Sequence, residues 1–342
     1  MINRLVWMET DNTYPYRNLA MEEYMTLHVP RGTCILYLWQ NRHTVVIGKN
    51  QNCWRECRVN FLEQEDGYLV RRLSGGGAVF HDLGNLNFTF IVGAGDYDVS
   101  RQLDVILEAV RSLGIHAEKT GRNDITVDGR KFSGNAFYRT GEGCYHHGTI
   151  LIRADKENMS RYLNVSKEKL ASKGVTSVKS RVANLCEFKP DITLEEVKSA
   201  LVEAFSKVYG QPAVRMEEGE LPQPDIDART EKFASWQWKY GRKIPFEYEM
   251  EKRFPWGNIQ IQFHVDKGMI QDVNVFSDAM DQEMIGMLAE QLKGCAYAEE
   301  DICRAVKAVG TDAFQAGEYT GADEPQSCRI KEDIMTLVRE SL

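Results

Sequence analysis

Residues 71–88 read RRLSGGGAVFHDLGNLNF, and the prediction of fold and function starts from this stretch. Three consecutive glycines lose much backbone freedom on folding, so they are expected where the chain bends sharply or a ligand approaches backbone N–H groups. Two arginines precede them, and arginine binds anions through bidentate, charge-assisted hydrogen bonds. Backbone N–H groups combined with arginine commonly bind phosphate. Because the stretch is neither a Walker A loop nor a GxGxxG turn, it indicates a phosphate site of another kind.

This interpretation has a simple alternative, a glycine-rich loop beside surface arginines that has no chemical role. The neighbours His81 and Asp82 extend the stretch, and such a pair forms a turn with a hydrogen-bonded imidazole more often than a catalytic dyad. Asn85 and Asn87 flank the strand expected at residues 86–92 and can be simple turn residues.

A second stretch, GRNDITVDGRKFSGNAFYR at residues 121–139, predicts a hairpin that carries a lysine. Asp128–Gly129 is a strong hairpin-turn dipeptide. Lys131 should therefore begin the returning strand and face back toward Asn123 and Asp124. A lysine in that place can offer a positive charge to a phosphate or a carboxylate, and the alternative is a solvated lysine on a hairpin.

A third stretch, CYHHGTILI at residues 144–152, places two histidines at the start of a buried strand. Adjacent residues on a strand face opposite sides, so at most one of His146 and His147 points into a common site. A metal site is therefore not favoured. One packed and one exposed histidine is an equally good interpretation.

Hydrophobic periodicity predicts a mixture of strands and helices, an α+β fold. Two domains are expected, because 342 residues exceed the ~250–300 residues at which a single core stops growing. Beyond about residue 250 a β-hairpin with its turn at Lys267–Gly268 precedes helices, so we expect a small C-terminal α+β domain. Residues 210–230, with three prolines and many acidic residues, are expected to form a surface excursion. We expect strands at 35–40, 44–48, 86–92, 124–128, 131–138, 147–152, 259–265 and 269–276, and helices at 101–113, 193–208, 281–293, 299–309 and 330–340.

Composition limits the class of protein. The formal net charge of −8 argues against a nucleic-acid binder with a wholly basic surface. No run of ~18 apolar residues occurs, so no membrane span is expected. The N-terminus does not have the pattern of a signal peptide, and the cytoplasm is the expected location. The eight cysteines are scattered, and Cys53 and Cys57 lack a second pair at zinc-site spacing, so free thiols are expected.

The three stretches together resemble the lipoate–protein ligase A family in its bacterial two-domain form. The stretches TVVIGKNQNCWRECR (44–58), KGVTSVKSRVANL (173–185) and SWQWKYGRKIPF (235–246) resemble the same family, in the same order. The resemblance implies a fold shared with biotin ligases, a mixed sheet surrounded by helices. It also implies a catalytic domain at residues 1–247 and an accessory domain at residues 248–342.

The implied reaction has two steps. ATP and lipoate give lipoyl-AMP and pyrophosphate, and the adenylate then acylates a lysine of a lipoyl domain. ATP and Mg²⁺ would act as co-substrate and lipoate as substrate, with no tightly bound prosthetic group. The acceptors would be apo lipoyl domains of 2-oxoacid dehydrogenase complexes or the glycine cleavage H protein, and a monomer is expected.

The resemblance further implies roles for single residues. Arg72 would contact nucleotide phosphate, and Lys131 would lie near the lipoyl carbonyl and the α-phosphate, where its ammonium stabilises developing negative charge. Asp124 would help to position Mg²⁺ or the adenylate. Asn85 and His147 would hold the adenylate or its acyl end. The residues implied for binding ATP and lipoyl-adenylate are Arg72, Gly75, Gly76, Gly77, Ala78, Val79, Phe80, Asn85, Asp124, Lys131 and His147.

Lipoyl domains are commonly acidic, so docking would need a local basic face on this acidic chain. Residues 167–181, KEKLASKGVTSVKSR, hold five Lys and Arg against one Glu and are the candidate, with a solvated loop as the alternative.

Four rival functions remain open from the sequence. An octanoyl or lipoyl transferase would form a thioester on a cysteine without ATP, and Cys144 is the nearest candidate if its pKa is lowered. A second rival is a transferase that uses preformed lipoyl-AMP. A biotin ligase is disfavoured because its own glycine–arginine signature is absent. A non-catalytic binding module is disfavoured by the intact Arg72 and Lys131.

Overall fold

The computed structural model describes residues 1–120, 124–164, 182–310 and 326–342, which form two compact units. Unit 1 comprises Met1–Ile47, Cys53–Arg71 and Ala78–Lys239. Unit 2 comprises Gly48–Asn52, Arg72–Gly77 and Tyr240–Leu342. Two short segments from the first quarter of the chain thus belong to the same unit as the C-terminus. The domain boundary expected between residues 247 and 248 stays a prediction.

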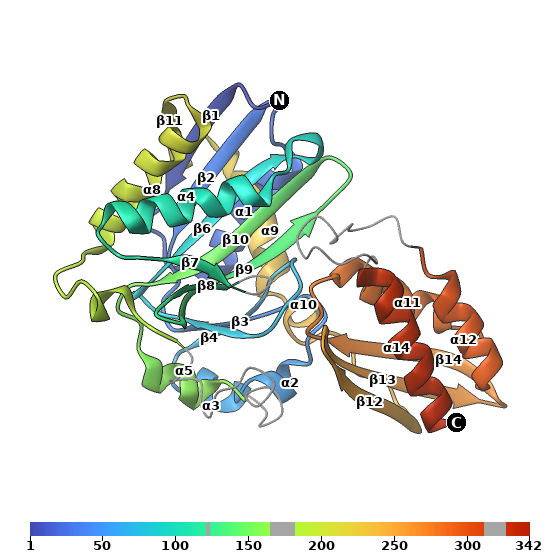
Figure 1. Ribbon diagram of the computed structural model, residues 1–342. Coiled ribbons are helices and arrows are strands. Elements are labelled where there is room, and N and C mark those ends of the chain that lie inside the picture. Colours follow the sequence, from blue (N-terminus) through green and yellow to red (C-terminus); the bar gives the residue numbers. More distant parts are fainter. Residues whose placement is uncertain (121–123, 165–181, 311–325) are drawn as a thin grey trace. The chain divides into compact units, whose positions relative to one another are not determined.

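Unit 1 contains, in its described residues, a mixed eight-stranded sheet (Figure 1). Its strands are β1 (Arg4–Glu9), β2 (Thr33–Trp39), β6 (Asn85–Gly93), β7 (Glu118–Thr120), β8 (Asp124–Val127), β9 (Arg130–Arg139), β10 (Gly143–Leu151) and β11 (Ala213–Arg215). They lie in the order β11-β1-β2-β6-β10-β9-β8-β7. β1 runs parallel to both its neighbours, and the other pairs are antiparallel. The mixed sheet confirms the predicted fold class.

One face of this sheet carries the apolar core of unit 1. Alternate residues of β2 and β6, among them Leu36, Leu38, Phe88 and Phe90, are fully buried in it. Helices α4 (Val99–Ser112) and α8 (Leu194–Tyr209) cover this face (Figure 1). The side-chain hydroxyl of Thr193 and the carboxylate of Glu196 form a capping box at the start of α8, so the helix begins where its sequence predicts.

Helix α1 (Pro15–Leu27) contacts β6 and β10 and also packs along α9 (Gln223–Ala234). The segment 210–230 lies at the surface as expected, with only Leu221 and Ile226 of its residues buried, but it is not without regular structure. That range contains the edge strand β11, the 3-10 turn η3 (Glu218–Glu220) and the start of α9. Its acidic residues do not all face solvent, because Glu218 and Asp227 form ion pairs with Arg17 of α1.

A smaller three-stranded sheet in unit 1, of order β4-β3-β5, flanks the glycine-rich loop along the chain. Its strands are β3 (Thr44–Ile47), β4 (Tyr68–Arg71) and β5 (Val79–His81). The short helices that accompany it are α2 (Cys53–Glu56), α3 (Val59–Gln64) and α5 (Lys156–Tyr162). Strands β4 and β5 end and begin at the two ends of the glycine-rich loop, so the small sheet fixes where that loop leaves and re-enters unit 1.

Unit 2 contains a three-stranded antiparallel sheet with helices packed on it, which confirms the predicted small α+β domain (Figure 1). Its elements are β12 (Tyr248–Phe254), β13 (Gly257–Asp266), β14 (Met269–Ser277), α11 (Gln282–Leu292), α12 (Glu299–Ala308) and α14 (Gln326–Ser341). The predicted turn at Lys267 and Gly268 is present, with φ of 51° and 76°. Ile259, Ile261 and Phe263 are fully buried in the core of this unit.

None of the helices in the described residues combines the length and the apolar character that crossing a membrane requires.

Candidate functional site

The face of the large sheet opposite the apolar core is buried and polar, which is unusual for the centre of a sheet. Strand alternation puts leucines and phenylalanines on the core face, so the intervening residues of β2, β6 and β10 face the other way, toward α1. Cα pairing aligns these residues in rows across the three strands. One row is Tyr37, Thr89 and His147, and the next is Trp39, Asn87 and Thr149.

A carboxylate from α1 enters the first row. Glu22 is 1% exposed, and its Oε1 accepts hydrogen bonds from Thr89 Oγ1 at 2.7 Å and from His147 Nδ1 at 2.9 Å. Trp39 Nε1 donates to the same hydroxyl at 3.0 Å. Because a carboxylate only accepts, His147 must carry a proton on Nδ1, and in the neutral ring Nε2 is then the acceptor nitrogen. No sequence pattern marks Glu22, because it lies 125 residues from its histidine partner.

The lysine hairpin forms as predicted. Asp128 and Gly129 have φ of 50° and 71°, the left-handed values that a type I′ turn between β8 and β9 requires. Lys131 Nζ lies 2.6 Å from Asp124 Oδ1, and the two side chains are 20% and 17% exposed. The expectation that Lys131 faces back toward Asp124 is confirmed, whereas Asn123 lies outside the described residues.

Gly134 gives Lys131 room to cross its own strand. A Cβ atom at Gly134 would lie 2.6 Å from Lys131 Nζ and 3.8 Å from Thr149 Oγ1. The ammonium group therefore lies over Gly134, on the sheet face that Thr149 shares with His147 and Asn87. The glycine in KFSGNA is thus required by the lysine, a role that becomes visible only when β9 and β10 are placed side by side.

Asn85 and Asn87 belong to strand β6, so the turn interpretation of these residues is wrong. Both are buried, and Asn85 Nδ2 donates to Asn87 Oδ1 at 2.9 Å. Within the described part of the chain, Asn85 Oδ1 and Asn87 Nδ2 have no hydrogen-bond partner. Buried polar atoms are rarely left unpaired, so this edge of the polar face can accept polar atoms of a ligand.

His146 and His147 point to opposite sides of the sheet, as predicted, but the interpretation with one exposed histidine is wrong. His146 is fully buried on the core face, with Nε2 2.8 Å from Asn135 Oδ1 and Nδ1 3.2 Å from Gln102 Oε1. Burial holds the pKa of His146 well below its usual value, with smaller contributions from His147 and Lys119. His146 is therefore a neutral structural residue on the core face.

The glycine-rich loop belongs to unit 2, where contacts with residues 279–280 explain its glycines. A Cβ at Gly75 would lie 2.7 Å from Met280 O, and Gly76, with φ of 86°, donates its N–H to Ala279 O at 3.1 Å. Arg72 is 5% exposed and folds over the loop, donating to Ser74 Oγ at 2.9 Å and to backbone carbonyls. Those carbonyl oxygens belong to Gly75 and Gly77, at 2.6 and 2.9 Å.

Arg71 also has a structural partner. Burial lowers the pKa of this guanidinium to about 10, and it donates to the carbonyl oxygens of Trp238 and Lys239, at 3.0 and 2.8 Å. Trp238 Nε1 donates back to Arg71 O at 2.7 Å. The alternative that placed surface arginines beside the loop is wrong, because both are buried; phosphate binding by Arg72 stays a prediction.

The rest of the signature returns to unit 1. Ala78 and Val79 are half-buried, and Phe80 is buried, with its ring stacked 5.4 Å from that of Tyr162. His81 Nδ1 lies 3.2 Å from Asn41 Nδ2. The Asp82 carboxylate accepts backbone N–H groups of residues 84 and 155, both at 2.8 Å, so this residue forms a turn as expected.

Lys131, Asp124, Asn85 and His147 therefore share one face of the large sheet in unit 1. The residues 72–77 of the predicted site lie in unit 2, and Ala78, Val79 and Phe80 lie in the small sheet region of unit 1. The basic stretch 167–181 lies outside the described residues.

Cys144, the candidate nucleophile of a transferase, lies on the wrong face. It is 0% exposed and belongs to the apolar core cluster, on the side of β10 opposite to Thr149. The eight cysteines form no disulfide in the described residues. Nor does the described part of the chain hold a group of three or more His, Cys, Asp or Glu side chains suited to a metal ion.

The fold is that of lipoate–protein ligases. The structure of P. falciparum LipL1 in complex with lipoate is 28% identical, covers 97% of this chain and 99% of its own, and superposes with a TM-score of 0.81. The bi-partite lipoate protein ligase of Thermoplasma acidophilum, solved with its E2 lipoyl domain, is 26% identical over 71% of this chain and 99% of its own, with a TM-score of 0.61. A lipoate-protein ligase A bound with ATP is 24% identical over 70% and 99% of the two chains, with a TM-score of 0.59, and shows a shared fold.

The chain belongs to the lipoyl protein ligase A/B catalytic domain family, whose model matches residues 14–206. The model of the bacterial lipoate protein ligase C-terminus matches residues 243–321. The predicted family resemblance is confirmed. The protein therefore belongs to a family of enzymes that attach lipoate to proteins.

Proposed function

We propose that this protein is an ATP-dependent lipoate–protein ligase that acts on apo lipoyl domains in the cytoplasm. The observation that carries the proposal is the Lys131–Asp124 pair on a buried polar face that also holds His147 and Asn85. Burying polar and charged side chains costs free energy that apolar side chains would not cost, so the stability of the fold does not explain why these four residues are there. In a chain of this family, their placement supports a site for a charged substrate.

In the first step a lipoate carboxylate oxygen attacks the α-phosphorus of ATP, a P–O bond forms, and the bond to pyrophosphate breaks. Negative charge builds up on the phosphoryl oxygens, and a preorganised cation stabilises it more than it stabilises the ground state. Lys131 would supply this cation. Asp124 holds the ammonium in place over Gly134 before substrate binds, so little reorganisation is needed.

In the second step the ε-amine of the acceptor lysine attacks the acyl carbon. A C–N bond forms, the C–O bond to AMP breaks, and the amine loses a proton. Lys131 would then face the acyl oxygen, and the polar atoms of Asn85 and the imidazole of His147 would contact the adenylate. Arg72 would bind phosphate once its guanidinium leaves the loop carbonyls that it contacts now.

Mg²⁺ fits this donor set in a limited way. Mg²⁺ in nucleotide enzymes usually takes one or two carboxylates, with phosphate oxygens and water as its other ligands. Asp124 can supply one carboxylate ligand, and ATP would supply phosphate oxygens. Bound there, the ion would neutralise part of the phosphate charge.

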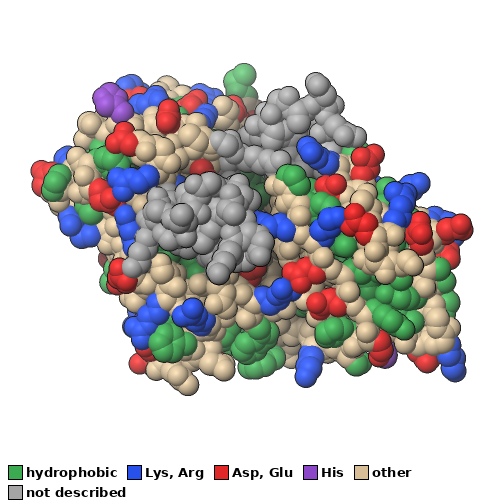
Figure 2. Space-filling model, turned by 60° about the horizontal axis from the view of Figure 1, so that its bottom comes forward, with side chains coloured by type: hydrophobic (Ala, Val, Ile, Leu, Met, Phe, Trp, Pro, Cys, Tyr) green, Lys and Arg blue, Asp and Glu red, His purple; other side chains and the backbone are tan. Residues whose placement is uncertain are grey.

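The acceptor we propose is a lipoyl domain, because the T. acidophilum relative was solved with its E2 lipoyl domain. The face of the molecule in Figure 2 carries basic and acidic side chains intermixed rather than in one block of a single sign. A net charge of −8 therefore does not prevent a local basic contact with an acidic partner. Residues 167–181 remain our candidate for that contact, and a monomer remains our expectation.

The ATP-independent transferase is the weaker candidate. It needs an accessible thiolate beside the acyl group. Cys144 is fully buried on the core face, with the sheet between it and Lys131.

The test is pyrophosphate release with ATP, Mg²⁺ and lipoate, followed by the mass of an apo lipoyl domain added as acceptor. We expect lipoate-dependent pyrophosphate and a lipoyl-sized mass gain, both lost in Lys131→Ala. Lys119 lies on β7 of the same sheet and pairs with Asp104 of α4, so Lys119→Ala is the control and should keep both activities. Acyl transfer without pyrophosphate release would reject the proposal in favour of a transferase, and use of preformed lipoyl-AMP alone would reject the first step.

A further inference from the structure

Helix α9 lies in a part of the chain that neither family model covers. The two models match residues 14–206 and 243–321, and α9 spans Gln223–Ala234 between them. The helix nevertheless packs along α1, the helix that carries Glu22. Its function must therefore be inferred from its own contacts.

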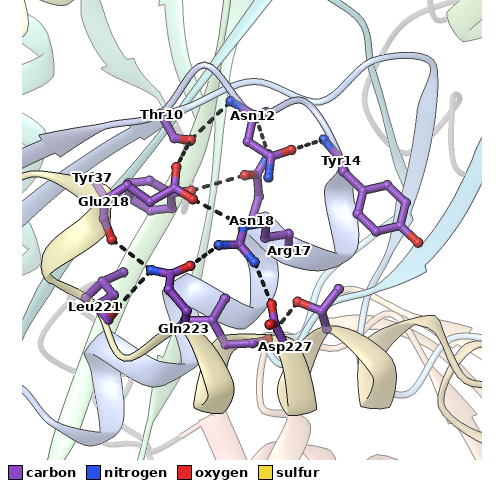
Figure 3. A network of polar contacts seen from close by, with 12 residues as sticks. Thr10, Asn12, Tyr14, Arg17, Asn18, Tyr37, Glu218, Leu221, Gln223 and Asp227 are labelled. Carbon is purple, nitrogen blue, oxygen red and sulfur yellow. Dashed lines mark hydrogen bonds and ion pairs between the residues drawn. The ribbon is translucent and has the colours of Figure 1, made fainter.

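Arg17 is the first of two charged residues through which α1 meets α9 and its leading turn (Figure 3). Its Nε lies 3.2 Å from Glu218 Oε1, and one terminal nitrogen lies 2.9 Å from Asp227 Oδ1. The other terminal nitrogen donates to Gln223 Oε1. All three donor groups of this guanidinium are thus directed at the segment 218–227.

Glu23 is the second charged residue, and it is almost completely buried. Its carboxylate is 8% exposed and contacts Arg229 at 2.9 Å and Lys232 at 2.5 Å, both from α9. A carboxylate buried to this extent is strongly disfavoured when its cations are removed. One buried anion between two cations therefore fixes the rotation of α1 about its own axis.

The rotation of α1 affects the polar face of the sheet, because Glu22, the residue just before Glu23, points to that face. Consecutive helical residues are about 100° apart, so turning Glu23 away from α9 also turns Glu22 away from Thr89 and His147. Asn18, one turn earlier, also faces the sheet; its Nδ2 donates to Gln40 O at 2.8 Å and Tyr37 Oη donates to its Oδ1 at 3.3 Å (Figure 3).

We propose that Arg229 and Lys232 of α9 are positioning residues for the active site. By holding Glu23 they set the rotation of α1, and Glu22 then keeps the proton of His147 on Nδ1, which leaves Nε2 as the acceptor nitrogen of the neutral ring. The effect on catalysis rests on the proposed ligase function. The effect on the proton position of His147 does not.

The competing explanation is that Arg229 and Lys232 only stabilise the fold. The protonation of the two ring nitrogens of His147 distinguishes this explanation from a positioning role. The probe is the ring ¹⁵N spectrum of His147 in the full-length protein, assigned with His147→Gln. We expect protonated Nδ1 and unprotonated Nε2 in the wild type, and a mixture of tautomers in Arg229→Met/Lys232→Met. Glu23→Gln, which keeps the shape of the side chain, should give a smaller change and serves if the double variant does not fold.

Lys198→Met is the matched control. Lys198 is 12% exposed and forms an ion pair that links α8 to Glu9 of β1. The substitution therefore removes a largely buried ion pair of unit 1 that does not involve α1. We expect its His147 spectrum to equal that of the wild type. An unchanged His147 spectrum in a folded Arg229→Met/Lys232→Met or Glu23→Gln protein would overturn the proposal.

Lipoyl transfer gives the second readout through a double-mutant cycle. We expect the Arg229→Met/Lys232→Met variant to lose about 10- to 100-fold in kcat/KM, the scale of small misplacements in an active site. In a His147→Gln background the same change should cost less than about twofold. Equal losses in both backgrounds would contradict the proposal. Absence of lipoyl transfer in the wild type would instead reject the ligase function, and the spectrum of His147 would still decide the role of α9.

Discussion

The glycine-rich loop and the lysine hairpin are the two stretches that the sequence marked for chemistry, and their structural contexts differ. Gly75 and Gly76 are required by contacts with residues 279–280, and Arg72 is bonded to the loop itself. Lys131 and Asp124 are partly exposed, and their side chains form an ion pair over Gly134.

A sequence signature can therefore combine two requirements. Gly75 and Gly76 have a packing role in unit 2, whereas the role that we propose for Lys131 is chemical. The comparison predicts that changes in the hairpin mainly affect activity and that changes in the loop also affect stability.

The largest effect is expected for Lys131→Ala. Removing one preorganised group that stabilises a transition state typically costs about 10²–10³ in rate, so pyrophosphate release should fall by that factor. The partly exposed ion pair should contribute less than about 1 kcal/mol to the free energy of unfolding. Pyrophosphate kinetics and a melting curve measure both. A large loss of stability with activity per folded molecule intact would show that Lys131 serves folding rather than catalysis.

Gly75→Ala should show the opposite pattern. Its Cβ would crowd the carbonyl oxygen of Met280, and overpacking of this kind costs about 1–3 kcal/mol. Gly286→Ala is the control in the same unit, because Gly286 lies within α11 and its added Cβ would meet no atom within 4 Å beyond its own helix backbone and chain neighbours. This variant should be more stable by about 0.5–1 kcal/mol. Calorimetry on both variants checks this. Equal stability of the two would show that the loop contacts do not constrain the glycine.

A smaller effect should appear at low pH through His146, which bonds to Asn135 of the hairpin's returning strand. Its folded pKa lies below the unfolded value of about 6.5, so the unfolded chain binds more protons as pH falls below 6.5 and the native state loses stability there. The loss is at most about 1.4 kcal/mol per pH unit. Denaturant unfolding at about pH 7.5 and 5.5 should show it for the wild type, and His146→Gln should show a flatter dependence.

The smallest effect is expected for Glu187→Gln. Burial alone would raise the pKa of Glu187, but hydrogen bonds from Lys156, the Asn184 backbone and Arg130 lower it to about 2. Its contribution is therefore present above the unfolded pKa of about 4.5 and lost as pH falls toward 2. Because the side chain is 32% exposed, we expect less than about 1 kcal/mol. Melting curves at about pH 7 and pH 3 should differ less for the variant, and an equal difference would reject this role.

Much of the fold could be predicted because local patterns determine it. Helices α4, α8, α11, α12 and α14 carry apolar residues at helical spacing, and the described strands of both hairpins lie within a few residues of the predicted ranges. Asp128–Gly129 and Lys267–Gly268 form their turns because these residues tolerate positive φ.

The two helices over the polar face could not be predicted in this way. Helix α1 buries Asn18, Glu22 and Glu23, so its polar residues face inward and its periodicity gives no signal. Helix α9 is charged because its partners are the charges of α1, some 200 residues earlier in the chain. Such a match is not visible until both helices are placed in space.

The site was predictable only where its partners are local. Lys131 and Asp124 lie seven residues apart across one turn, and the hairpin brings them together. Glu22 and His147 are 125 residues apart, and the need for Gly75 arises from residues 279–280. The family resemblance named the positions, but only the register of β6, β10 and β9 shows which of them share a face.

Formation of lipoyl-AMP by this protein can be followed through one oxygen atom of lipoate. Lipoate whose carboxylate carries heavy oxygen is mixed with the protein, ATP, Mg²⁺ and an apo lipoyl domain, and the AMP produced is analysed by mass spectrometry. If the carboxylate attacks the α-phosphorus as proposed, one heavy oxygen atom appears in each AMP, and Lys131→Ala suppresses its formation. Lipoylated acceptor formed without labelled AMP would contradict the account.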